Sequence, residues 1–112
     1  MKVITHNKLV RDKIPAIIEK DGKICTTEIL SDEEYLKMLD AKLDEELAEY
    51  HKDQNMEELA DLLEVIYAVA GARGYSIAEL EQVRSEKAEQ RGAFKEKILL
   101  KEVLYHGQTN NA

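Results

Sequence analysis

Three capping boxes divide most of this chain into helices, and they constrain its fold more than any other feature of the sequence. In a capping box, an N-cap side chain and a Glu three residues later accept hydrogen bonds from amides at the start of a helix. The boxes are Ser31…Glu34, Asn55…Glu58 and Ser76…Glu79. They predict helices over residues 32–52, 56–73 and 77–91, with Gly74 and Gly92 ending the last two.

The first two of these predicted helices should form a hairpin. Only residues 53–55 connect them, and so short a connection makes two helices antiparallel neighbours. The composition, 44% hydrophobic and 35% charged over 112 residues, leans on residues that favour helices. We therefore expect a mainly α fold, an antiparallel helical bundle, in a single domain over residues 1–106.

Short β elements are expected near both ends of the chain. Residues 23–30 (KICTTEIL) alternate with β-branched side chains, and residues 1–5 are a second candidate strand. A short strand needs a partner, which residues 98–104 could supply. Residues 8–20 should contain one or two helical turns around Pro15. Residues 107–112 have almost no apolar content and are expected to be a disordered tail.

Charge and cysteine usage exclude several classes of function. A formal net charge of −7 would repel a nucleic-acid backbone, so no nucleic-acid polymer is expected as a partner. Residues 1–15 have no apolar core of signal-peptide length and no run approaches about 18 apolar residues, so no signal peptide or membrane span is expected. The lone Cys25 excludes a multi-thiolate metal site. We expect a cytoplasmic protein with no membrane contact. Because so small a helical core is thin, we also expect it to form a homo-oligomer.

Two glutamates of the first predicted helix lie beside its apolar stripe. The stripe consists of Leu36, Leu39, Leu43, Leu47 and Tyr50. At about 100° per residue, Glu46 lies roughly 60° and Glu49 roughly 120° from the centre of that stripe. Glu45 lies nearly opposite the stripe, so its side chain should face solvent or contact the metal ligands from outside the site. Glu46 and Glu49 are therefore the pair that can reach inward together.

The second predicted helix carries two acids in an otherwise apolar run. Residues 59–70 read LADLLEVIYAVA, which is typical of a buried helix. Burial of an ionised carboxylate is costly, so Asp61 must be paired, protonated or bound to a cation. Glu58 lies one turn before Asp61. The two helices thus present Glu-x-x-Glu and Glu-x-x-Asp to each other across the hairpin.

Together these four carboxylates, Glu46, Glu49, Glu58 and Asp61, form an oxygen-only cluster with no His. Such a cluster suits Mg²⁺, with Mn²⁺ as a possible substitute, and it leaves coordination positions for water and phosphate. The alternative is that these acids are surface residues with i, i+4 partners. The roles of Glu57 and Glu64 stay open, and either could be an outer ligand, a general base or an ion-pair partner.

Two groups of cations are candidate phosphate ligands. Arg84, Lys87 and Arg91 recur at i, i+3 and i+7, on the side of the third helix that carries Ile77 and Leu80. The alternatives are ion pairing with Glu57 or Glu64, or side chains that extend from the edge of the core. A second group near the N-terminus, Lys8, Arg11 and Lys13, could close the other side of a phosphate pocket.

The pattern Glu45-Glu46-x-x-Glu49 followed by Glu58-x-x-Asp61 resembles the signature of the MazG-like all-α nucleotide pyrophosphohydrolases. Residues 7–18 (NKLVRDKIPAII), the stretch LADLLEVI and residues 87–94 (KAEQRGAF) resemble its small phosphoribosyl-ATP pyrophosphohydrolase-like branch. The segment between Glu49 and Glu58 is shorter than is common in that superfamily, where it helps to shape the base pocket.

The resemblance implies Mg²⁺-dependent attack of water on an α–β phosphoanhydride, which gives a nucleoside monophosphate and pyrophosphate. The substrate would be a nucleoside triphosphate or phosphoribosyl-ATP. By position, Glu46, Glu49, Glu58 and Asp61 would be the metal ligands, and Lys87 and Arg91 would contact phosphates. It also implies a homodimer or homotetramer. The alternative function is a non-catalytic helical oligomerisation or interaction module. Its acids would pair with Arg84, Lys87 and Arg91 to fix an oligomer, and it would bind no metal.

Overall fold

The computed structural model describes residues 2–107, in which four helices follow one another along the chain. They are α1 (Ile14–Lys20), α2 (Asp32–Asp53), α3 (Met56–Ala72) and α4 (Ile77–Arg91). The mainly α class is therefore confirmed. Within these residues, no helix combines the length and hydropathy needed to span a membrane.

The three longer helices begin where the capping boxes predict. Ser31 Oγ accepts a hydrogen bond from the Glu34 amide at 3.2 Å, and Asn55 Oδ1 accepts one from the Glu58 amide at 2.9 Å. The third box is reciprocal, since Ser76 Oγ accepts from the Glu79 amide at 3.0 Å while the Ser76 amide donates to Glu79 Oε1 at 2.9 Å.

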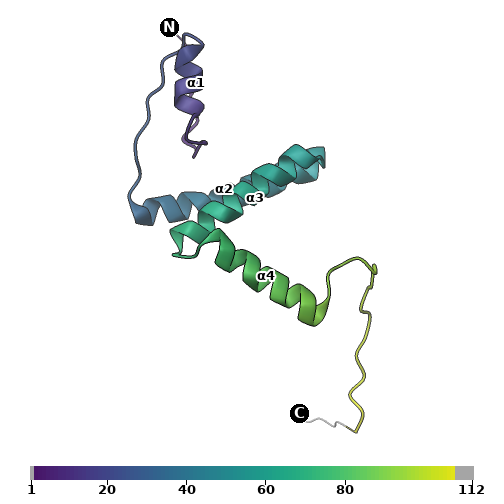
Figure 1. Ribbon diagram of the computed structural model, residues 1–112. Coiled ribbons are helices and arrows are strands. Elements are labelled where there is room, and N and C mark those ends of the chain that lie inside the picture. Colours follow the sequence, from purple (N-terminus) through teal and green to yellow (C-terminus); the bar gives the residue numbers. More distant parts are fainter. Residues whose placement is uncertain (1, 108–112) are drawn as a thin grey trace. The chain divides into compact units, whose positions relative to one another are not determined.

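Helices α2 and α3 pack together as a hairpin and lie side by side in Figure 1. The connection is tight because Gln54 adopts a left-handed conformation with φ of 51° and Asn55 already caps α3. Among the described helices, α2 and α3 are the one pair that packs. The chain divides between Leu80 and Glu81 into two units, and each is described by itself. The single domain expected over residues 1–106 stays a prediction.

The expected β elements are not seen, and this part of the prediction is wrong for the described residues. Residues 2–5, 23–30 and 98–104 form no strand. A strand exists only when its amides pair with a neighbour, and β-branched side chains alone do not supply one. Of the expected disordered tail over 107–112, residues 108–112 lie outside the described residues.

The core is thinner than the apolar sequence of α3 predicts. The buried apolar residues are Leu39 of α2 and Ala70 of α3, at 4% and 8% exposure. Leu59, Leu63 and Ile66 of α3 remain 49%, 46% and 37% exposed. In the single chain α3 is therefore less buried than its apolar sequence predicts, because α2 covers only one side of it.

Candidate metal centre

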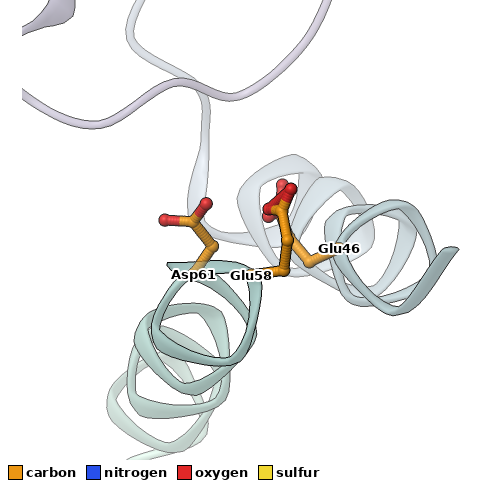
Figure 2. A group of neighbouring side chains, drawn as sticks. All are labelled: Glu46, Glu58 and Asp61. Carbon is orange, nitrogen blue, oxygen red and sulfur yellow. The ribbon is translucent and has the colours of Figure 1, made fainter. Parts of the chain in front are cut away.

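Three of the four predicted carboxylates converge on one side of the hairpin. Glu46 comes from α2, and Glu58 and Asp61 come from successive turns of α3. One carboxylate oxygen from each lies within 4.8 Å of the others. Figure 2 shows the three side chains pointing to the same side of the two helices. The helical spacing in the sequence and the short connection together produce this convergence.

The three acids differ in their surroundings. Glu46 is the most buried, at 9% exposure, and its Oε1 lies 3.8 Å from Nζ of Lys42 one turn earlier. Glu58 is half-buried, and the Asp61 side chain is 40% exposed. The apolar run around Asp61 predicts deeper burial than this, and Asp61 is more exposed because α2 covers only one side of α3. Asp61 has a cationic partner in the chain, the guanidinium of Arg11.

Glu58 is the acid of the cluster whose pKa its neighbours raise. Partial loss of hydration raises the pKa of Glu58 above its ordinary value, and the adjacent carboxylate of Asp53 raises it further. The charges of Asp61 and Glu49 act in the same direction. Like charges held together in this way favour either a proton or a cation at Glu58.

Glu49 belongs to a second, overlapping group rather than to the first. Its carboxylate, with those of Asp53 and Glu58, brings one oxygen each within 4.8 Å of the others, and Glu49 and Asp53 are exposed. In the sequence, Asp53 is predicted only as part of the connection between the two helices and not as a ligand. The i, i+4 spacing of Glu49 and Asp53 on one face of α2 is the signal that could have found it.

The donor set of the first group fits a hard divalent cation. Mg²⁺ prefers oxygen ligands at about 2.0–2.1 Å, and carboxylates are the charged ligands it selects. Each of the three side chains offers one oxygen within 4.8 Å of the other two, an arrangement that could hold one metal ion. Glu58 connects the two groups, so its loss affects both.

Two N-terminal cations lie against the acids of the hairpin. Arg11 Nη2 donates a hydrogen bond to Asp61 Oδ1 at 2.7 Å, and Lys8 Nζ donates to Glu45 Oε2 at 3.3 Å. Glu45 is half-buried rather than solvent-facing. Although burial favours its neutral form, Lys8 and Lys42 hold the pKa of Glu45 below its ordinary value. Glu45 lies outside both groups of acids.

The predicted cations of α4 are all exposed. Arg84 pairs with Glu81 of its own helix, and this contact raises the pKa of the Arg84 guanidinium. Lys87 and Arg91 are exposed along the same helix, and α4 contains no buried residue. The inward face expected for α4 stays a prediction. Their role as phosphate ligands stays a prediction.

Comparison with known proteins leaves the activity open. No family model matches the chain, and no solved structure matches it. A curated protein of Mycolicibacterium smegmatis, described as an uncharacterized protein, is 55% identical over 42 residues. The matched stretch is 38% of this chain and 43% of that protein, so less than half of either is covered. The resemblance to the MazG-like pyrophosphohydrolases therefore stays an expectation.

Proposed function

We propose that this protein is a Mg²⁺-dependent nucleotide pyrophosphohydrolase. It would cleave the α–β phosphoanhydride of a nucleoside triphosphate or phosphoribosyl-ATP and release a monophosphate and pyrophosphate. The observation that carries the proposal is the convergence of Glu46, Glu58 and Asp61 from two helices, with an oxygen of each within 4.8 Å of the others. Three carboxylates held this close repel one another, and a divalent cation among them would offset that repulsion.

The carboxylates would hold the metal. Glu46, Glu58 and Asp61 supply oxygens from one side of the hairpin, and Glu49 adds one through the group it shares with Glu58. A bound Mg²⁺ or Mn²⁺ would neutralise phosphate charge and lower the pKa of a coordinated water. The buried Glu46 fixes one ligand, whereas the exposed Glu49 can adjust.

The cations would hold the phosphates. Lys8 and Arg11 lie beside the hairpin acids, where a metal-bound polyphosphate would place its negative charge. Arg84, Lys87 and Arg91 complete the proposed substrate-binding set on the basis of the sequence resemblance. Such chemistry would suit a cytoplasmic protein that acts on free nucleotides.

We also propose that the protein works as a homodimer or homotetramer. Leu59, Leu63 and Ile66 fall at i, i+4 and i+7 and form an exposed apolar stripe along α3. Leu47 of α2 is 43% exposed as well. A second copy that packs on this hairpin would supply the cover that the single chain lacks.

A substrate screen tests the activity. Purified protein is incubated with Mg²⁺ and a panel of standard and modified nucleoside triphosphates and phosphoribosyl-ATP, and pyrophosphate release is measured. The Glu58→Gln variant should lose activity at least about 100-fold with its best substrate, while Glu33→Gln, which alters an exposed acid of α2, should retain it. If no member of the panel yields pyrophosphate, or if Glu58→Gln matches the wild type, the proposal is wrong.

A non-catalytic interaction module is the second candidate. The ion pairs Arg11–Asp61 and Lys8–Glu45 support it, because these acids already have cationic partners within the chain. In that case the protein binds no metal, and Asp61→Asn lowers its thermal stability. An enzyme would lose metal binding instead. The two candidates therefore separate on metal affinity alone.

A further inference from the structure

The segment of residues 7–11 lies along the hairpin and is attached to it by a few contacts. Lys8 pairs with Glu45 of α2, Arg11 pairs with Asp61 of α3, and Leu9 is half-buried. A small pocket where the segment meets α2 is lined by Asn7, Lys8, Leu9, Met38, Ala41, Lys42 and Glu45. The contacts that attach the segment thus include two exposed ion pairs and one half-buried apolar side chain.

One of these ion pairs uses a carboxylate that the metal site also needs. Asp61 Oδ1 accepts a hydrogen bond from Arg11 Nη2 at 2.7 Å, and Asp61 also supplies an oxygen to the group with Glu46 and Glu58. Asp61, Glu64 and Glu46 all attract the Arg11 guanidinium. Arg11 therefore gives this side of the hairpin the positive charge that a divalent cation would otherwise supply.

We propose that Arg11 and a divalent cation compete for Asp61, so that metal binding releases the segment of residues 7–11 and frees the Arg11 guanidinium for a nucleotide phosphate. The inference rests on the proposed metal site. A cation among the three acids repels the guanidinium and reduces the negative field that holds it. The freed guanidinium lies close to a metal-bound polyphosphate and can bind two of its oxygens. Metal binding therefore precedes tight nucleotide binding.

The ion pair is weak enough to be displaced. The Arg11 side chain is 56% exposed and that of Asp61 is 40% exposed, so water and salt screen their attraction. Removal of the competing guanidinium should therefore strengthen metal binding by a modest factor, roughly two- to fivefold.

The test is a calorimetric titration of Mn²⁺ into the wild-type chain, Arg11→Gln and Arg73→Gln. The last is a matched control, because Arg73 pairs with Asp40 at 3.8 Å and its loss changes the net charge equally. Arg73 lies twelve residues after Asp61, about 18 Å along the helix direction at about 1.5 Å per residue. We expect tighter Mn²⁺ binding in Arg11→Gln and no more than a slight change in Arg73→Gln.

A second measurement reports release of the segment in the wild-type chain. Trypsin must take Lys8 or Arg11 into its acidic pocket, which their ion pairs with the hairpin oppose. Saturating Mg²⁺ should therefore accelerate cleavage after these two residues severalfold, as followed by mass spectrometry, with cleavage after exposed Lys101 as the reference.

The outcomes separate the inference from the proposed function. Tighter Mn²⁺ binding confined to Arg11→Gln, with faster cleavage of the segment, supports the competition. If the wild type binds Mn²⁺ but Arg11→Gln binds it equally or more weakly, the competition is wrong while the metal site stands. If no form of the protein binds Mn²⁺, the proposed metal site fails and the inference fails with it.

Discussion

The four predicted carboxylates are not equivalent in the structure. Glu46 is the most buried acid and shares a group with Glu58 and Asp61, whereas Glu49 is exposed and shares a different group with Asp53 and Glu58. Their angular positions beside the leucine stripe explain the difference. Glu46 lies nearer the stripe and is carried towards α3, while Glu49 lies further round the helix.

This difference predicts unequal effects of two otherwise matched substitutions on α2. Glu46→Gln should weaken Mn²⁺ binding at least about tenfold, because it removes a buried ligand that cannot easily be replaced. Glu49→Gln should weaken binding less, because the exposed Asp53 can take its place. Calorimetric titration of both variants measures the order. A larger loss in Glu49→Gln would show that the second group holds the metal.

At the scale of the elements, the sequence predicts the helices correctly because local hydrogen bonds determine where they begin. The ends of α2, α3 and α4 fall within one residue of the predicted ranges, because Ser31, Asn55 and Ser76 satisfy the first amides of each helix. Residues 23–30 show the opposite case. A strand there would require a partner from a distant part of the chain, and no local pattern supplies that information.

The same distinction applies to the site. The i, i+3 spacing and the short connection predict that Glu46, Glu58 and Asp61 meet, and they do. The ion pair between Arg11 and Asp61 could not be predicted, because fifty residues separate them and the sequence suggests only that the N-terminal cations close a phosphate pocket. The group containing Asp53 was missed because its residues span a helix end.

The cap at Asn55 supports both the hairpin and the site. Its side-chain oxygen accepts from the amide of Glu58, the residue that both groups of acids share. Asn55→Ala should lower the free energy of unfolding by about 1 kcal/mol, whereas Asn55→Ser keeps a capping oxygen and should lower it less. Urea unfolding of the two variants measures this. Equal stability of Asn55→Ala and the wild type would mean that the cap does not hold this end of α3.

At the scale of the whole molecule, the exposed apolar stripe of α3 is the feature that a single chain leaves unexplained. Leu63 at its centre is 46% exposed, so a charge there costs the isolated chain little. The same charge would be buried at an interface between copies and would be costly there. The stripe therefore predicts an oligomer that dissociates when Leu63 is replaced by a charged residue.

Light scattering after size-exclusion chromatography tests this expectation. The wild type should have at least twice the chain mass of 12.8 kDa, and Leu63→Glu should have the mass of one chain. Ile29→Glu serves as the control, because Ile29 is 97% exposed and lies outside the hairpin. A wild-type protein with the mass of a single chain would contradict the proposed oligomer.

Metal binding through Glu58 tests the proposed metal centre most directly. Mn²⁺ is titrated by calorimetry into the wild type, Glu58→Gln and Glu33→Gln, where Glu33 is an exposed acid thirteen residues before Glu46 and about 20 Å away along the helix. We predict saturable binding to the wild type, binding at least about tenfold weaker in Glu58→Gln, and little change in Glu33→Gln. A wild type without saturable binding, or a Glu58→Gln variant with unchanged affinity, would contradict the account.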